Sequence, residues 1–180
     1  MIDGSGARLI RIDGLTEAVL DVGLHAYADA AFADRPGSRA STGAHIVTAT
    51  GLPLVWKTKK QPLVTLSTTE AEFINLTPCG SSLLWINNIL TEAGHPQRLP
   101  IMMFTDSANA RHKALNPLQT ARTKHIDLRY KWIIDRVKNG YFSLQHVASE
   151  DMTADGLTKP LEKTKHQRFC VQIGLQICPF

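Results

Sequence analysis

A short apolar segment that ends at an acidic residue constrains the fold most. Residues 101–104 are Ile, Met, Met and Phe, and Asp106 follows after a single Thr. A run of this length and composition is typical of a buried central strand, because such a strand is covered on both faces. We therefore predict a sheet with residues 100–105 near its centre and an acid at the end of that strand.

Three strand-like segments come before it. Residues 24–29 alternate between apolar and polar positions and end at Asp29. Residues 44–50 and 52–56 follow, separated by Gly51. Two strands joined by a tight turn and preceded by a first strand predict an antiparallel meander.

A long helix is predicted next, after a basic connector over residues 57–62. Residues 67–70, Ser-Thr-Thr-Glu, match the capping box that begins many helices. The helix is expected over residues 68–93. Pro78 has no N–H and its ring clashes with the preceding turn, so we expect a kink or a break into two helices there.

The rest of the chain completes an alternating pattern. It contains a predicted helix over 107–115, a helix over 125–138, a strand over 141–147 and, from residue 150 on, helical pieces broken by Gly156 and Pro160. The order βββ-α-β-α-α-β-α is that of an α/β layer fold. Residues 1–23 show no sustained period and are predicted to be a lead-in, with residues 24–180 as one domain.

Composition narrows the class of protein. The chain has 180 residues, of which 43% are hydrophobic and 20% charged, as in globular domains. A net charge of +4 permits a polyanionic partner without requiring one. The three cysteines form no CxxC pair, which disfavours a disulfide framework or a structural zinc site. No signal peptide or membrane-spanning run is visible, so an intracellular protein without a membrane partner is expected.

Acidic residues stand where α/β proteins place their chemistry. If the first and fourth strands are neighbours, Asp29 and Asp106 converge at one edge of the sheet. Glu72 lies early in the long helix and Asp155 lies after the last strand. Carboxylates that meet in a cleft repel one another, and a hard divalent cation such as Mg²⁺ relieves that repulsion. Alternatively, each acid is a solvated or helix-capping residue.

Glu70 and Glu72 compete for the role in the long helix. The two side chains point about 160° apart around the helix axis, so they cannot serve one site. Capping already accounts for Glu70, and we therefore predict Glu72 as the site residue.

Seven motifs together resemble one family. They are residues 27–34 (YADAAFAD), 39–43 (RASTG), 56–61 (WKTKKQ), 66–73 (LSTTEAEF), 105–107 (TDS), 121–130 (ARTKHIDLRY) and 154–160 (ADGLTKP). In this order they resemble the ribonuclease H domain of copia-type LTR retrotransposon polyproteins, especially fungal elements. The resemblance covers about residues 24–175.

The resemblance implies a ribonuclease H-like fold with a five-stranded mixed sheet flanked by helices. It implies hydrolysis of the RNA strand of RNA/DNA hybrids by a two-metal-ion mechanism that leaves 5′-phosphate ends. Two Mg²⁺ ions are the expected cofactor, and Mn²⁺ is expected to substitute for them. The expected partner is the reverse transcriptase domain of the same polyprotein, in a cytoplasmic virus-like particle or the nucleus.

The family's four carboxylates carry over onto Asp29, Glu72, Asp106 and Asp155. Two departures accompany them. Ala31 stands where many copia elements have a second Asp, which is not a metal ligand. Residues 147–151 contain no loop His of the kind that cellular ribonucleases H carry. His146 is expected to be structural, and a group such as Glu150 is expected to assist instead.

Contacts to nucleic acid are predicted on two segments. The predicted residues are Ser41, Thr42, Arg122, Lys124, His125 and Arg129. Basic and aromatic side chains share one flank of the 125–138 helix, including Trp132 and Arg136, which suits a phosphate backbone. Alternatively, that flank is solvated and Trp132 packs beneath it. Lys57, Lys59 and Lys60 are expected to form only a general electrostatic rim.

Two further readings remain beside an active ribonuclease. One is a decayed or domesticated module that only binds nucleic acid or a protein partner. The other is a transposase or integrase relative, which the order of the acids along the chain disfavours.

Overall fold

The computed structural model describes residues 23–33, 39–116 and 127–175, with the side chains of 127–130 excepted. The elements in chain order are β1 (His25–Ala31), β2 (Thr42–Ala49), β3 (Leu52–Lys60), α1 (Thr68–Glu92), β4 (Ile101–Thr105), α2 (Ala108–Leu115), α3 (Asp127–Lys138), β5 (Phe142–His146), the 3-10 helix η2 (Ser149–Asp151), α4 (Asp155–Thr158) and α5 (Lys163–Gln172). The predicted order of elements is confirmed, with the last helical part in pieces. The boundary between a lead-in and a domain at residue 23 stays a prediction.

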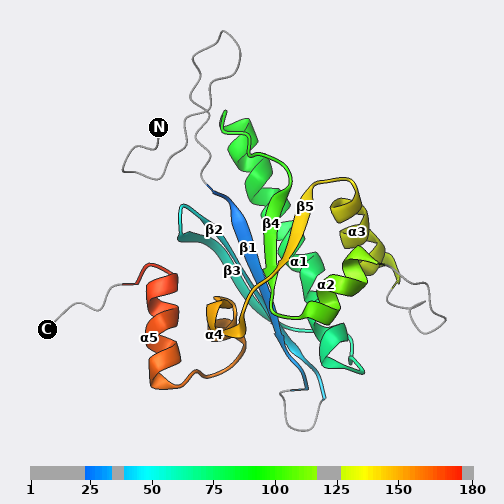
Figure 1. Ribbon diagram of the computed structural model, residues 1–180, viewed down its shortest axis with the longest axis vertical. Helices are drawn as coiled ribbons and strands as arrows, with labels where there is room; N and C mark the ends of the chain where they lie inside the picture. The colour runs from blue at the N-terminus through cyan, green and yellow to red at the C-terminus, as the bar shows by residue number, and fades with distance from the viewer. Residues whose placement is uncertain (1–22, 34–38, 117–126, 176–180) are drawn as a thin grey trace, which may run out of the picture.

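The five strands form one mixed sheet in the order β3-β2-β1-β4-β5. The pairs β1–β2 and β2–β3 are antiparallel, and the pairs β1–β4 and β4–β5 are parallel. The predicted meander and the predicted neighbours β1 and β4 are therefore confirmed (Figure 1). This arrangement brings the carboxyl ends of β1 and β4 to the same edge of the sheet.

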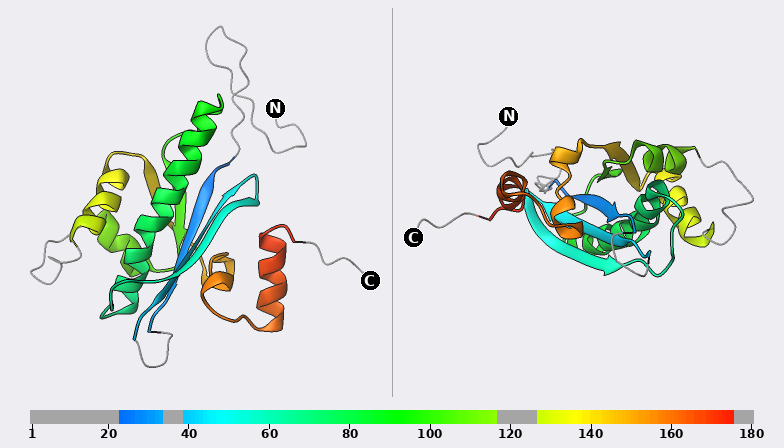
Figure 2. Two further views of the ribbon diagram at one scale, coloured as in Figure 1. Left: turned by 180° about the vertical axis from the view of Figure 1, so that it is seen from behind. Right: turned by 90° about the horizontal axis from the view of Figure 1, so that it is seen from below.

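Helices cover the two faces of the sheet unequally. Helix α1 lies across β1 and β2 and is flanked by α2 and α3, while α4 and α5 lie side by side away from them (Figures 1 and 2). The adjacent β2 residues Ile46 and Val47 belong to different apolar clusters, which places those clusters on opposite faces. The larger cluster lies under α1, and the smaller one, around Met152 and Ala154, lies under the α4 segment.

Strand β3 is longer than predicted, and the connector expected over residues 57–62 is wrong. The strand continues to Lys60 because β2 pairs along its whole length, from Ala49 opposite Leu52 to Thr42 opposite Lys60. Pairing with a neighbouring strand outweighs the weak strand preference of lysine. The basic residues are therefore part of the sheet edge.

The expected ends of β1 and β2 also shift. Strand β1 does not end at Asp29 but runs to Ala31, because β2 begins at Thr42 and pairs with it there. Asp29 pairs with Ala44 and is thus held within the sheet.

Helix α1 begins as predicted and does not break. The Ser67 hydroxyl accepts a hydrogen bond from the Glu70 N–H at 3.2 Å, and the Glu70 carboxylate accepts one from the Leu66 N–H at 2.7 Å. Of the two outcomes expected at Pro78, a kink or a break into two helices, the break is wrong, since one helix continues through it. Burial of Cys79, Leu83 and their neighbours against the sheet outweighs the cost of about 3 kcal/mol for an interior proline.

Strand β4 is covered on one face only, so the full burial predicted for it is wrong. Ile101 and Met103 are buried, but the Met102 side chain is 47% exposed. Phe104 stacks on Tyr27, with ring centroids 5.0 Å apart. Of the β4 residues, Ile101 and Met103 belong to the apolar cluster under α1, whereas Met102 and Phe104 face the other side of the sheet.

The C-terminal pieces differ from expectation at one glycine. Gly156 lies inside α4 and does not interrupt it, whereas Pro160 separates α4 from α5 as predicted. A Cβ at Gly156 would lie 2.6 Å from the Phe169 ring of α5. The residue is a glycine because the two helices approach closely there.

Candidate active site

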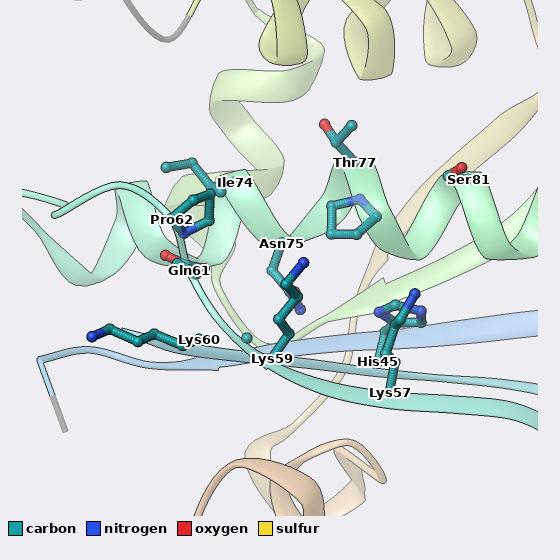
Figure 3. A pocket seen from close by; sticks show the side chains of 12 residues that line it. His45, Lys57, Lys59, Lys60, Gln61, Pro62, Ile74, Asn75, Thr77 and Ser81 are labelled. Carbon is teal, nitrogen blue, oxygen red and sulfur yellow. The ribbon is translucent and has the colours of Figure 1, made fainter. Parts of the chain in front are cut away.

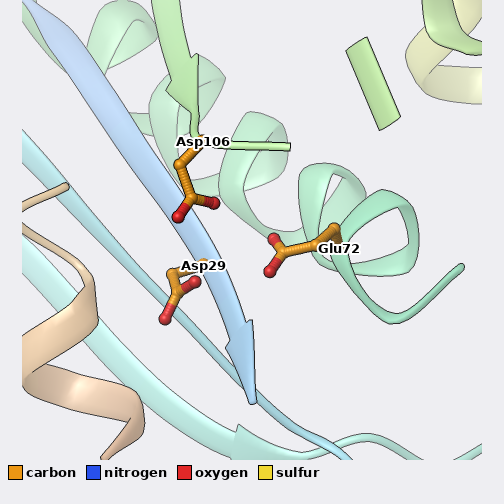
Figure 4. Close-up of side chains that lie close together, drawn as sticks. All are labelled: Asp29, Glu72 and Asp106. Atoms are coloured by element: carbon orange, nitrogen blue, oxygen red, sulfur yellow. The ribbon is translucent and has the colours of Figure 1, made fainter. Parts of the chain in front are cut away.

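Three carboxylates converge where β1 and β4 end. Asp29 in β1, Asp106 after β4 and Glu72 in α1 each offer an oxygen, and these atoms lie within 4.8 Å of one another (Figure 4). We refer to these three residues as the acid cluster. The prediction that Glu72 and not Glu70 faces this position agrees with the geometry, because Glu70 is occupied at the helix start.

Glu72 reaches the cluster because β1 and β4 separate. Their pairing ends at Tyr27 opposite Phe104, before the strands themselves end. The Ala30 N–H donates a hydrogen bond to Glu72 Oε1 at 3.1 Å. A turn later, the Asn75 amide donates to the carbonyl oxygens of Asp29, at 2.8 Å, and Ala44, at 2.6 Å. Helix α1 is thereby fixed to the backbone of β1 and β2.

Burial controls the electrostatics of the acid cluster. Asp29 is 4% exposed and Glu72 is 8% exposed. Burial, together with the neighbouring carboxylates, raises the pKa of Glu72 to about 9. Burial is also the main reason that the pKa of Asp29 rises to about 6, although the hydroxyl of Thr158 opposes the rise. The ionised cluster is therefore unfavourable without a compensating cation.

The cluster fits a hard divalent cation. Carboxylate oxygens are the ligands that Mg²⁺ prefers. Among the described residues, Glu72 Oε2 is a buried oxygen that receives no hydrogen bond. A cation held by Asp29, Glu72 and Asp106 would satisfy that oxygen and relieve the repulsion.

Asp155 lies beside the cluster but outside the set of three. It starts α4, and its Oδ1 lies 2.5 Å from the Lys159 ammonium. The Thr158 hydroxyl donates to Asp29 Oδ2 at 2.5 Å, so α4 caps one oxygen of Asp29. Partial burial lowers the pKa of Lys159, but the bond to Asp155 and the nearby carboxylates outweigh it and raise that pKa.

The loop after β5 supplies contacts that the sequence analysis missed. The Ser149 hydroxyl donates to Asp106 Oδ2 at 2.8 Å, and His146 Nε2 lies 3.1 Å from the Asp106 carbonyl oxygen. Glu150 points instead to α5, where its carboxylate lies 3.7 Å from the Arg168 guanidinium. No pattern in the sequence of this loop distinguishes Ser149 from an ordinary surface serine.

The predicted nucleic-acid contacts stay predictions. Ser41 and Thr42 are buried, and the Ser41 hydroxyl accepts from the Ala33 N–H at 3.2 Å and lies 3.0 Å from Thr65 Oγ1. The remaining candidates fall outside the described part of the chain: Arg122, Lys124 and His125 by position, and Arg129 by its side chain.

The flank of α3 is partly internal. Trp132 packs against the larger apolar cluster. The Arg136 guanidinium lies 5.6 Å from the Trp132 ring centroid and 4.9 Å from that of Tyr141. This packing favours the alternative in which Trp132 supports the helix and does not contact bases.

The sheet order and the helices around it define a ribonuclease H-like fold. The LC11-RNase H1 isolated from compost superposes with a TM-score of 0.56 at 15% identity, covering 74% of this chain and 91% of that one. Its complex with an RNA/DNA hybrid gives a TM-score of 0.51 at 12% identity over 74% of this chain and 92% of that one. The N-terminal RNase H domain of rv2228c from Mycobacterium tuberculosis gives 0.52 at 12% identity, over 81% and 96% of the two chains. At these identities the likeness shows the fold.

The amino-acid sequence is similar to three retrotransposon polyproteins. The chain is 37% identical over 156 residues to the retrovirus-related Pol polyprotein from transposon RE1 of Arabidopsis thaliana, covering 87% of this chain and 11% of that protein. It is 38% identical over 152 residues to the RE2 polyprotein of the same plant, covering 84% and 10%. The TNT 1-94 polyprotein of Nicotiana tabacum is 35% identical over 152 residues, covering 84% and 11%. No protein-family model matches the chain.

The chain is thus similar to a segment of these retrotransposon Pol polyproteins and spans about a tenth of their length. These relatives come from plants, and the resemblance to fungal elements stays a prediction. In the part of the chain that the structure describes, no helix has the length and apolar character needed to cross a bilayer.

Proposed function

We propose that this chain is the ribonuclease H domain of a copia-type polyprotein and hydrolyses the RNA strand of RNA/DNA hybrids. The convergence of Asp29, Glu72 and Asp106 within 4.8 Å on a ribonuclease H-like fold carries the proposal. Support comes from the Pol polyproteins that it matches and from the hybrid-bound structure that shares its fold.

The proposed cofactor is a pair of Mg²⁺ ions, and Mn²⁺ is proposed to substitute for them. Asp29, Glu72 and Asp106 would hold the first, and Asp155 together with Asp29 would hold the second. When bound, the ions supply an activated water and neutralise charge at the phosphodiester and at the leaving 3′ oxygen, which leaves a 5′-phosphate.

The surrounding side chains position the carboxylates. Thr158 orients Asp29 and Ser149 orients Asp106, each through one hydrogen bond to a carboxylate oxygen. Each bond uses one oxygen of its carboxylate, which leaves the other oxygen for a cation. Preorganised ligands of this kind reduce the cost of assembling a charged site.

Lys159 neutralises Asp155 in the absence of a cation. Its side chain is 52% exposed, so it has room to swing into solvent when a cation takes its place at Asp155. The same contact favours a binding module without turnover, because the Lys159 ammonium occupies the Asp155 oxygen that a second cation would need.

The substrate test compares three nucleic acids of one sequence. The chain is incubated with an RNA/DNA hybrid, duplex DNA and single-stranded RNA in Mg²⁺ and in Mn²⁺. We expect cleavage of the hybrid RNA strand and no cleavage of duplex DNA. Binding of the hybrid without cleavage in either ion would contradict the proposal and favour the non-catalytic module.

The polyprotein context is also a proposal. We propose that residues 24–180 form the folded domain after a lead-in over 1–23, and that the reverse transcriptase part of the same polyprotein presents the hybrid to it. The proposed setting is a cytoplasmic virus-like particle or the nucleus.

A further inference from the structure

A groove of about 330 Å³ lies between α1 and β3, apart from the acid cluster (Figure 3). The lining residues that matter here are His45, Lys57, Lys59, Lys60, Asn75 and Ser81. We refer to this cavity as the basic groove. Its lining contains no Asp or Glu.

The register of β3 aims two lysines into the groove. Lys57 lies opposite His45, and Lys59 lies opposite Gly43. His45 faces α1, because its Nε2 lies 2.9 Å from the Ser82 hydroxyl of that helix. Thr58, between the two lysines, faces the other side and donates to the Leu157 carbonyl at 3.0 Å. Strand alternation therefore places Lys57 and Lys59 on the α1 side.

The positive charge of the groove is not compensated by neighbours. Within the described part of the chain, no carboxylate forms an ion pair with Lys57, Lys59 or Lys60. Lys57 and Lys59 are about 7 Å apart along the strand, so both can reach one stretch of a polyanion. His45 adds no charge at neutral pH, since burial and the nearby Lys57 lower its pKa to about 4.

The groove and the acid cluster share a wall. Asn75 lines the groove, and its amide holds the Asp29 carbonyl at 2.8 Å. Asp29 pairs with Ala44, and Ala44 pairs with Thr58, so the backbone between the two lysines lies about 10 Å, or two strand spacings, from Asp29. The Asp29 and Thr58 side chains share the face toward α4, opposite the lysines, so a nucleic acid reaches Lys57 and Lys59 from the cluster by passing around the β3 edge.

We propose that the basic groove binds the sugar–phosphate backbone of a nucleic acid, beyond the segment that occupies the acid cluster. The inference rests on the proposed function only in taking a nucleic acid as the ligand. Phosphate contacts of this kind position a duplex without reading its sequence. The lysines of β3 thus form a binding site and not a diffuse rim.

Lysines on an edge strand have another established use. They discourage pairing between the exposed edges of two sheets. That role requires no cavity beside the helix and no binding of nucleic acid. The two explanations therefore predict different effects of removing the charges.

The test measures binding of a 20-base-pair RNA/DNA hybrid to the full chain by fluorescence anisotropy. It is carried out in the Asp106→Asn background so that no cleavage occurs. The groove variant is Lys57→Gln with Lys59→Gln. The matched control is Lys163→Gln with Lys165→Gln, which removes the same charge from α5. Circular dichroism checks that each variant is folded.

We expect the groove variant to bind on the order of tenfold more weakly at low salt. Its plot of log affinity against log salt is expected to be shallower by about 2, because two phosphate contacts are lost. The control is expected to change both quantities little. Inorganic phosphate at the same ionic strength is expected not to compete, since a backbone and not an isolated anion is bound.

Four results would overturn the proposal. Three are equal effects of the groove variant and the control, an unchanged salt slope, and increased self-association with unchanged hybrid binding. Competition by inorganic phosphate would likewise point to a simple anion site. Because binding is measured without turnover, a chain that never cleaves hybrid leaves this test intact.

Discussion

The acid cluster and the basic groove take residues from strands β1 and β3, about two strand spacings apart, yet they hold charge in opposite ways. In the cluster, Asp29 and Glu72 are buried, and their pKa values are raised. In the groove, Lys57 and Lys59 are exposed. Buried like charges destabilise the fold until a compact cation neutralises them, whereas exposed charges cost little and attract an extended polyanion.

The largest expected effect comes from removing one charge inside the cluster. Glu72→Gln should lower single-turnover hybrid cleavage by at least about 1,000-fold, because a metal ligand is lost. Glu70→Gln is the matched control, two residues away in the same helix, and should change the rate by less than about threefold. Equal losses of cleavage rate in both variants would show that Glu72 has no role beyond that of a residue at the helix start.

The same substitution should stabilise the metal-free protein. The pKa of Glu72 is raised to about 9 in the folded protein, against about 4.5 in the unfolded chain. Glu72 therefore stabilises the fold fully below pH 4.5, and this contribution is lost as the pH rises toward 9. At pH 7 the loss is about 3 kcal/mol. Urea unfolding in a chelator should therefore show Glu72→Gln to be more stable than the parent at pH 7, with little difference at pH 4. A parent that is the more stable of the two at pH 7 would contradict this account.

His45 should produce a pH dependence of the opposite sign on the groove side. Its pKa is lowered to about 4, so the stability present above the ordinary value of 6.5 is lost as pH falls through that range. Between pH 6.5 and pH 5 the loss is about 2 kcal/mol. The difference in unfolding free energy between the parent and His45→Gln should follow this curve. His95→Gln, at an exposed position, serves as the control. The same pH dependence of unfolding free energy in this variant would show that the effect does not come from the burial of His45.

Lys159 should have the smallest of these effects. Lys159→Ala removes the ammonium that competes at Asp155, so Mn²⁺ should bind about three- to tenfold more tightly by calorimetry. Lys163→Ala is the control on α5. Unchanged or weaker Mn²⁺ binding in Lys159→Ala would show that the lysine does not compete with a cation.

Much of the site was predictable because its residues lie where predicted strands end or a predicted helix begins. Asp106 follows an apolar strand, and Glu72 follows from a capping box that already accounts for Glu70. These signals are local. The predicted proximity of Asp29 and Asp106 depended only on β1 and β4 being neighbours, and they are neighbours in the sheet.

The rest depended on contacts between distant segments. Ser149 and Thr158 reach carboxylates that are 43 and 129 positions away along the chain, and no local pattern distinguishes them from other hydroxyl residues. The continuation of β3 to Lys60 depended on pairing with β2, which overrides the preference of a lysine-rich segment for a loop. The sequence therefore predicted a connector where the structure has the lysines of the basic groove.

The most direct test of the central claim is the Mg²⁺ dependence of hybrid cleavage in the parent chain and in Asp106→Asn. Single-turnover rates are measured at saturating hybrid, with hybrid affinity determined in parallel. The parent should be inactive in a chelator and should gain activity as Mg²⁺ is added. Asp106→Asn should stay at least about 1,000-fold slower at every Mg²⁺ concentration and still bind hybrid. A variant that cleaves within about tenfold of the parent would contradict a site in which the three carboxylates act together through a metal ion.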